Sequence, residues 1–359
     1  MKNKNIVIYT MSLWDEPNRG RHHLANQLSK DNKVIWVNRK LDRFDNYNPF
    51  IGLQKISSNL SVLHTGPSIF PNFIPRRVDE WMNINNYLRL KILLKVINDE
   101  NFSPDIIWIY DYKALNVVKF FQNKCTTLYF CNDFYGDYAY SYEKKLVKSI
   151  DFIFSTDPRL KKRFQNINSN SHYIPHGSWP VSSQPIFEKK NEPESIGYIG
   201  TINDTLDINV FSMILEKTKL KIIIAGPFSE CNNKRKVFFK NKRVQYHGDL
   251  EQKDRELVIK KLDVCLLPYH PKVNGFALKF FDYISFGKPI FSTEYDFPWP
   301  SNYKKFIRFY NDEMDIDNFI FNMYKSWDIN HFNDAISLSK KSRWSDRVSK
   351  ISKKLNLKL

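Results

Sequence analysis

Short runs of apolar, mostly β-branched or aromatic residues recur along the chain, and each is followed by a stretch long enough for a helix. The runs lie at residues 5–10, 33–37, 105–110, 126–131 and 151–155, and then at 195–200, 220–226, 243–248, 262–268 and 288–293. Their hydrophobicity is continuous rather than alternating, which is typical of strands buried on both faces of a parallel sheet. Strands that alternate with helices in this way predict an α/β fold with doubly wound sheets.

A polar, proline-bearing stretch, SWPVSSQPIFEKKNEPES, separates the two groups of strands. A chain of 359 residues also exceeds what one core usually supports. We therefore predict a Rossmann-like domain over residues 1–178, a linker over 179–194, a second Rossmann-like domain over 195–330 and a C-terminal helix over 331–359. Ligands bind at the carboxyl ends of the strands in such sheets, so we expect a cleft between the domains to hold the substrates.

The composition narrows the possible partners and the compartment. The formal net charge is +17, and the excess of lysine and arginine is spread over both halves. An acidic partner is expected, which leaves nucleic acid, anionic lipid and phosphorylated small molecules. No apolar run is long enough for a transmembrane helix, and the first residues lack the pattern of a signal peptide. Four cysteines without metal-ligand spacing fit free thiols in a reducing cytoplasm.

The segment GFALKFFDYISFGKPIFST, residues 275–293, carries two charged residues in an otherwise apolar helix. The helix is predicted to begin near Asn274 and to end at Gly287. Lys279 and Asp282 are three residues apart and share a face. A cation in the first turns opposes the helix dipole unless an anion binds there, which favours a diphosphate site. Asp282 could then accept hydrogen bonds from ribose hydroxyls. The alternative is an ion pair between the two residues on a solvated face.

Several segments of the second half, IGYIGTIND, IIIAGP, VQYHGDL, DVCLLPY and ALKFFDYISFGKPIFST, resemble the donor-binding half of GT-B glycosyltransferases. The likeness is to the bacterial cell-surface polysaccharide type, glycosyltransferase group 1. This chain matches the family's pattern for this helix, with Ala277 in the place of a proline and Asp282 in the place of a glutamate. In the first half, MSLWDEPNRGRHHLANQLSKDNKVIWVN, LYFCNDFYGDY, DFIFSTDPRL and YIPHG resemble the same family. The resemblance implies two Rossmann-like domains facing a cleft, with the C-terminal helix crossing back to the N-terminal domain.

The resemblance also implies roles for individual residues. Lys279 would hold the donor diphosphate and Asp282 the ribose. The other residues implied at the donor site are Gly200 and Thr201 under the diphosphate, Pro227 and Phe228 beside the base, and Leu278 and Asn274 around the helix start.

The chain also departs from the retaining members of the family. Many of them carry two glutamates where this chain has Asn274 and Asp282, and an Arg and a Lys where it has TINDTLD. The related xanthan-type glucuronosyltransferases, which invert, pair the lysine of this helix with an aspartate of the N-terminal half as general base. Asp133 occupies the matching position, although it could instead cap the next turn.

Further polar residues are candidates for other roles. Asp137 is a weaker candidate than Asp133 for the base. His176 is expected to shape a turn before the linker. Asp315 and Asp317 mimic a metal-binding Asp-x-Asp motif but stand at a predicted helix start, so we expect no metal and no other cofactor. The candidate acceptor-binding residues come before or at the start of the first predicted helix: Trp14, Asp15, His22 and His23. The alternative for the two histidines is a solvated helix start.

The sequence therefore predicts a glycosyltransferase that moves a sugar from a nucleotide diphosphate donor to a lipid-linked surface polysaccharide or oligosaccharide. One alternative is a sugar-nucleotide epimerase of the same fold. Another is a basic nucleic-acid-binding protein, which is disfavoured because the aromatic residues lie within strand runs. The segment GPSIFPNFIPRRVDEW, residues 66–81, combines apolar residues with Arg76 and Arg77. It predicts peripheral contact with the anionic inner face of the cell membrane, and the alternative is an ordinary loop folded over the core.

Overall fold

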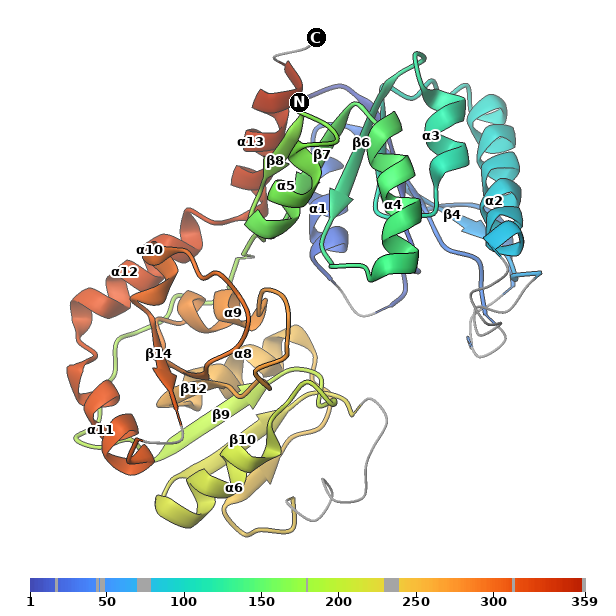
Figure 1. The fold of residues 1–359 in the computed structure, drawn as a ribbon. Helices are drawn as coiled ribbons and strands as arrows, with labels where there is room; N and C mark the ends of the chain where they lie inside the picture. The colour runs from blue at the N-terminus through green and yellow to red at the C-terminus, as the bar shows by residue number, and fades with distance from the viewer. Residues whose placement is uncertain are drawn as a thin grey trace. The chain divides into compact units, whose positions relative to one another are not determined.

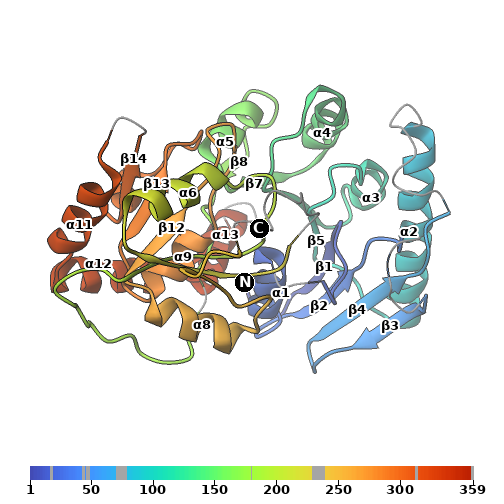
Figure 2. The same ribbon diagram turned by 90° about the horizontal axis from the view of Figure 1, so that it is seen from below.

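A computed structural model describes residues 1–16, 19–42, 45, 49–69, 79–178, 180–228, 239–311 and 314–356. The chain divides into two compact units. Unit 1 consists of Met1–His176 together with Trp344–Leu359, and unit 2 consists of Gly177–Arg343. Each unit has a largely parallel sheet with helices packed against it (Figures 1 and 2).

Unit 1 is built on one sheet with the strand order β3-β4-β2-β1-β5-β6-β7-β8. All neighbouring strands are parallel except β3, which is antiparallel to β4. The strands are β1 (Asn5–Tyr9), β2 (Lys33–Val37), β3 (Ile51–Lys55), β4 (Leu60–Thr65), β5 (Ile106–Ile109), β6 (Thr126–Cys131), β7 (Phe152–Ser155) and β8 (Ser171–Tyr173). The helices are α1 (Gly20–Leu28), α2 (Asp79–Asp99), α3 (Leu115–Phe121), α4 (Asp137–Ser149), α5 (Pro158–Gln165) and α13 (Trp344–Asn356).

Both faces of this sheet are covered, as the continuous apolar runs predict. On β1, Val7 and Tyr9 join the core under helices α2 to α5, whereas Ile6 and Ile8 join the core under α1 and α13. Helix α13 therefore packs on unit 1, which confirms the expected return of the C-terminal helix to the N-terminal domain. Its Trp344 ring packs so closely on α1 that a β-carbon at Gly20 would lie 2.9 Å from the ring.

Unit 2 has one parallel sheet with the strand order β11-β10-β9-β12-β13-β14. Its strands are β9 (Ser195–Ile199), β10 (Lys221–Ala225), β11 (Val244–Tyr246), β12 (Val264–Leu267), β13 (Ile290–Thr293) and β14 (Ile307–Tyr310). Its helices are α6 (Ile208–Lys217), α8 (Gln252–Lys261), α9 (Lys279–Ser285), α10 (Ser301–Lys304), α11 (Ile316–Ser326) and α12 (Ile329–Lys340). The predicted strands of this half are all present.

The C-terminal segment differs from its prediction. Residues 331–359 were expected to form one helix, but α12 packs in unit 2 and α13 in unit 1. The reason is that the apolar residues of this segment form two separate sets: Ala335 and Leu338 contact the core of unit 2, and Ile351 and Leu355 belong to the core of unit 1. The predicted linker also belongs to unit 2, where the Ser182 amide donates to the buried Glu256 carboxylate at 2.8 Å. Among the described residues, no helix is long and apolar enough to cross a membrane.

Candidate functional site

The order of the strands in unit 2 marks one place where a ligand is expected. The chain runs from β9 outward to β10 and β11, and then returns to the other side of β9 with β12. The carboxyl ends of β9 and β12 therefore bound a topological switch point, the usual ligand crevice of an open parallel sheet. Gly200 follows β9, Tyr269 comes shortly after β12, and helix α9 begins at Lys279. The donor residues predicted from the sequence thus come from the loops at this edge.

The side chain of Lys279 crosses directly over Gly200. A β-carbon at Gly200 would lie 1.8 Å from Cε of Lys279, so any other residue would displace the lysine. Gly200 also has φ +147°, a conformation that other residues rarely adopt. The Lys279 ammonium donates to the Tyr269 hydroxyl at 3.3 Å and lies 5.1 Å from the centre of the Tyr198 ring. The loop and the helix start therefore hold the ammonium at the switch point.

No carboxylate of a described residue neutralises this ammonium. Among the residues that the structure describes, Lys279 forms no ion pair, and its distance to Asp282 is not that of a salt bridge. The ion pair considered as the alternative from the sequence is therefore absent. Burial lowers the pKa of Lys279, but the phenol groups of Tyr198 and Tyr269 more than offset it and raise the pKa, so the side chain is charged at neutral pH. A partly buried charge without a counter-charge is costly, and an anionic ligand would relieve the cost.

Asp282 lies one turn further along α9 and is half-buried. Its carboxyl has no hydrogen bond or ion pair with any described residue. Burial raises its pKa to about 7, while the charges of Arg255 and Lys279 act in the opposite direction. The carboxyl is therefore able to accept hydrogen bonds from a ligand, and its protonation changes near neutral pH.

The loop after β10 also contains a glycine, and it packs against the loop after β9. Gly226 follows β10 with φ +134°, and a β-carbon there would lie 2.1 Å from the Gly200 carbonyl oxygen. Beside it, the Pro227 carbonyl accepts from the Ile202 amide at 2.9 Å. The Phe228 ring lies 5.1 Å from the rings of both Phe239 and Tyr246, which gives this edge of the site an aromatic wall.

The other predicted donor residues occupy the surrounding backbone. The Thr201 side chain is exposed, and its carbonyl accepts from the Tyr198 hydroxyl at 3.0 Å. Leu278 is the residue before the first turn of α9. Asn274 does not begin the helix as predicted but lies in the preceding loop, where its backbone bridges to Asp296. The helix starts later because Gly275 has φ +137°, which is not helical.

In unit 1, Asp133 follows β6 and is exposed. Its carbonyl accepts from the Cys131 thiol at 3.3 Å, which anchors the turn. Although the side chain is exposed, partial desolvation raises the pKa of Asp133, and the guanidinium groups of Arg21 and Arg19 lower it in part. Neither arginine side chain forms an ion pair within the described part of the chain. Asp137 begins α4, but its side chain lies outside the described residues.

The predicted acceptor residues separate into two kinds. His22 is fully buried, its Nδ1 accepts from the Arg19 amide at 3.0 Å, and its Nε2 lies 3.2 Å from the Leu13 carbonyl oxygen. Its ring stacks on Trp36 at 4.7 Å. Both ring nitrogens are therefore occupied by backbone, so His22 is a packing residue and the predicted acceptor contact does not fit it. Asp15 is exposed, whereas Trp14 and His23 are half-buried.

Two other predictions concern turns. The His176 carbonyl accepts from the Arg347 side chain at 3.1 Å, which ties the end of the first segment of unit 1 to α13, and burial lowers the pKa of His176 to about 3. Asp315 caps helix α11 by accepting from the Asp317 amide at 3.1 Å, as a helix-start residue should. Within the described residues, no group of three or more His, Cys, Asp or Glu side chains could hold a metal ion.

A second charged network lies at the switch point of unit 1, and no local pattern in the sequence indicates it. Buried Arg89 of α2 pairs with Asp111, which follows β5, at 3.0 Å. It also donates to the Asn86 side chain at 2.9 Å, to the Asn38 carbonyl at 3.2 Å and to the Thr10 carbonyl. An arginine inside a long helix is usually predicted to be a surface residue. Asp111 lies next to Arg89 only because of the order of the strands in the sheet.

The two units together define the fold as GT-B, the two-domain glycosyltransferase fold. The chain is similar to sucrose-phosphate synthase from Thermosynechococcus elongatus, with TM-score 0.69, 12% identity and coverage of 98% of both chains. It is also similar to the catalytic domain of starch synthase IV from Arabidopsis thaliana bound to ADP and acarbose, with TM-score 0.68, 10% identity and coverage of 98% and 99%. A lipopolysaccharide outer core galactosyltransferase matches with TM-score 0.68, 12% identity and coverage of 99% of both chains. No family model and no curated protein sequence matches the chain.

Proposed function

We propose that the protein is a glycosyltransferase that uses a nucleoside diphosphate sugar as donor. The observation that carries the proposal is the Lys279 ammonium, which lies over Gly200 at the switch point of unit 2 and has no carboxylate partner in the described part of the chain. A diphosphate would supply the missing negative charge, and a charge-assisted contact of this kind is worth about 1.5–3 kcal/mol. Asp282, one turn away, would accept hydrogen bonds from the ribose. The aromatic wall at Phe228 would border the base.

The transfer would use one group from each unit. Asp133, at the end of β6, would accept the proton of an acceptor hydroxyl as that oxygen attacks the anomeric carbon of the donor sugar. The bond between the anomeric carbon and the diphosphate oxygen breaks in the same step. The nucleoside diphosphate leaves with the electron pair, and Lys279 stabilises its charge. This single displacement would invert the anomeric configuration. It requires no metal ion, so we expect chelation by EDTA to leave the rate unchanged.

The acceptor we propose is a lipid-linked glycan of the cell surface. Arg19 and Arg21 both act electrostatically on Asp133, and neither has a carboxylate partner among the described residues. Arg21 is half-buried, so its unpaired charge favours an anionic ligand beside the proposed base. A phosphate that links a glycan to its lipid would meet this requirement.

We also propose peripheral association with an anionic membrane. Arg76 and Arg77 of the predicted contact segment lie outside the described residues. In the described segments that flank them in sequence, Ile69 is 60% exposed and Tyr87 of α2 is 49% exposed, with the Lys91 ammonium 4.7 Å from the Tyr87 ring. Exposed apolar side chains next to cations are typical of surfaces that contact a lipid interface. The net charge of +17 adds long-range attraction.

A vesicle-binding assay tests this part of the proposal. The protein should bind vesicles that contain anionic lipid at low salt and dissociate as the salt concentration rises, because each basic residue near the surface contributes about 1 kcal/mol. The double variant Arg76→Glu with Arg77→Glu should bind more weakly, and Lys253→Glu on α8 with Lys260→Glu is the charge-matched control. Binding that does not depend on lipid charge would contradict the proposal.

The central experiment is a thermal-shift screen of nucleotide sugars on the full chain. A donor at 100 times its dissociation constant stabilises the protein by about 2.7 kcal/mol, which gives a clear rise in the unfolding temperature. The donor that is found is then incubated with and without lipid-linked glycan. A transferase forms a glycosidic product only with the acceptor, whereas an epimerase converts the donor alone. A screen in which no nucleotide sugar stabilises the protein would argue against the proposal.

A further inference from the structure

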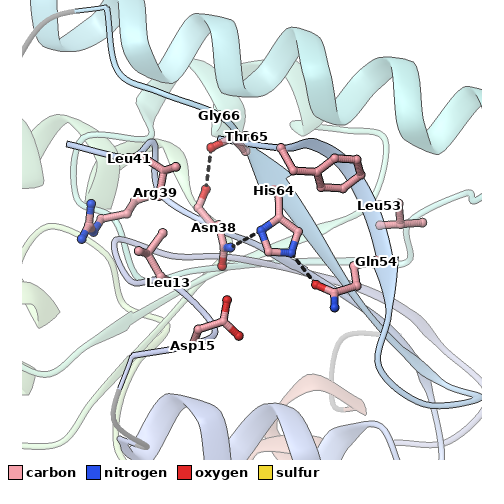
Figure 3. Close-up of a pocket in the computed structure, with 11 residues that line it drawn as sticks. Leu13, Asp15, Asn38, Arg39, Leu41, Leu53, Gln54, His64, Thr65 and Gly66 are labelled. Carbon is pink, nitrogen blue, oxygen red and sulfur yellow. Dashed lines mark hydrogen bonds between the residues drawn. The ribbon is translucent and has the colours of Figure 1, made fainter. Parts of the chain in front are cut away.

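Unit 1 has a pocket that the proposed reaction does not use. It lies at the carboxyl ends of β1, β2 and β4, with the edge strand β3 as one wall (Figure 3). Its volume is about 400 Å³, within the range of small-ligand sites. The sequence pattern gave no sign of it, because its polar residues come from three separate strands and loops.

A chain of hydrogen bonds orients the polar wall of this pocket. The buried Asn38 side-chain oxygen accepts from the Trp14 amide at 2.8 Å and from the Trp36 indole at 2.9 Å. The Asn38 amide nitrogen is therefore the donor toward His64 Nδ1, 3.3 Å away. That assigns the ring proton to Nε2, which donates to the Gln54 side-chain oxygen at 2.7 Å. The Gln54 amide nitrogen is left at the end of the chain as an oriented donor.

The opposite side of the pocket offers an acceptor. Figure 3 shows Asp15 and Gln54 on opposite sides, with His64 between them. Leu13, Leu41 and Leu53 give the remaining walls apolar surface. An oriented donor, a carboxylate and apolar walls together suit a sugar ring, whose hydroxyl groups both donate and accept and whose C–H groups need apolar contact.

The charges of the pocket disfavour an anion. Arg39 lines it, but its guanidinium pairs with Asp45 at 2.6 Å and with Glu16 at 3.2 Å. Among the described residues that line the pocket, Arg39 is the single cation and is already balanced by carboxylates, and Asp15 is a further acidic residue of the lining. Phosphate groups and acidic sugars would be repelled, so the chemistry fits a neutral or amino sugar. This separates the pocket from the arginines beside Asp133.

We propose that this pocket binds a non-acidic sugar ring of the acceptor glycan, remote from the hydroxyl that reacts. The proposal rests on the glycosyltransferase function above. Strands β2 and β6 are separated by β1 and β5, so the pocket and the turn of Asp133 lie about 14 Å apart along the sheet edge. An oligosaccharide spans that distance, and a single sugar ring does not. The pocket would therefore select acceptors that already carry several sugars.

The direct test is ligand-observed NMR on the full chain with a panel of neutral methyl glycosides and N-acetylglucosaminides. At least one should bind at millimolar concentration, and UDP or ADP should not displace it. The variant Gln54→Glu keeps an oxygen for His64, removes the amide donor and adds one negative charge, so binding should become about threefold to tenfold weaker. The control Lys55→Gln makes the same charge change on the other face of β3 and should leave binding unchanged.

The outcomes distinguish this proposal from the proposed function. A panel without any binder, or binding equally strong in Gln54→Glu, would overturn the pocket assignment even if transfer is observed. Sugar binding that is lost in Gln54→Glu, without any transfer from a nucleotide sugar, would retain the pocket and refute the transferase. With an active enzyme, Gln54→Glu should raise KM for long acceptors and leave their kcat nearly unchanged. A fall in kcat alone would contradict a remote binding role.

Discussion

Both units place a cation at the switch point of their sheet, but the two cations differ in their partners. Arg89 of unit 1 has a carboxylate, a side-chain amide oxygen and backbone carbonyls around its guanidinium. Lys279 of unit 2 has one phenol hydroxyl at 3.3 Å and no carboxylate among the described residues. Arg89 is therefore satisfied by the protein, whereas Lys279 lacks a counter-charge that a ligand can provide.

This difference shows how a structural charge is told apart from a functional one. Burial alone does not decide, because both side chains are at least partly buried. What distinguishes a structural from a functional charge is the number of protein groups that satisfy it. We therefore expect changes at Arg89 to affect folding and changes at Lys279 to affect ligand binding.

The largest expected effect separates the chemistry of unit 1 from the donor binding of unit 2. Asp133→Asn should lower kcat by about 10²- to 10⁴-fold, because the proposed base is lost. Nucleotide affinity, measured by calorimetry, should stay within a few-fold of the wild type. Near-normal turnover in this variant would place the base elsewhere or favour a retaining mechanism.

Replacing the satisfied cation should destabilise the protein. Arg89→Ala leaves the Asp111 carboxylate buried without its partner, which should lower the free energy of unfolding by about 3–5 kcal/mol. Denaturant unfolding followed by fluorescence measures this loss. Arg89→Met combined with Asp111→Leu removes both charges and should recover most of it. If Arg89→Ala unfolds like the wild type, the contrast between the two cations is lost.

Replacing Lys279, the cation without a counter-charge, should weaken ligand binding and leave the stability almost unchanged. Lys279→Ala should weaken nucleotide binding by about tenfold to a hundredfold, from a lost contact of about 1.5–3 kcal/mol, with little loss of stability. Lys288 is the matched control, because its ammonium donates to the carbonyls of Lys260 and Leu262 at 2.8 and 2.6 Å. Lys288→Ala should destabilise unit 2 and leave the affinity of the remaining folded protein unchanged. Equal affinity in wild type and Lys279→Ala would refute the donor site.

The smallest expected effect is a pH dependence at Asp282. Ribose hydroxyls would donate to the ionised carboxyl, so the nucleotide sugar should bind the deprotonated form and lower the pKa from about 7. Affinity should therefore rise with pH and level off above 7, and fall by up to about tenfold per pH unit below it. A nucleotide sugar is the right probe because its phosphates do not titrate near neutrality. Asp282→Asn should abolish this slope, and a slope that persists would assign it to another group.

Much of the fold could be predicted from the sequence because strands buried on both faces leave continuous apolar runs, as in β5 and β12. The hairpin β3–β4 was missed because its strand β3 lies at the edge and mixes exposed and half-buried residues. β14 was missed because its exposed Arg308 interrupts a short run.

Some of the site residues could likewise be predicted from the sequence, and others could not. Lys279 and Asp282 could be proposed because charges in an apolar helix stand out locally. Arg89 could not, since its partner is 22 residues away in sequence and meets it only through the strand order. His22 was misassigned because the sequence does not show that Trp36 covers it.

The return of α13 to unit 1 has a consequence for how the protein is made. Unit 2 is one continuous segment whose two ends meet, with the Ser178 amide donating to the Ser342 carbonyl at 2.8 Å. Unit 2 can therefore fold on the ribosome as soon as it has emerged. Unit 1 cannot complete its core until later, since Trp344, Ile351 and Leu355 are synthesised after unit 2. During synthesis the α1 face of unit 1 is an open apolar surface, and a chain that stops after Arg343 would keep it open and become a target for chaperones and proteases.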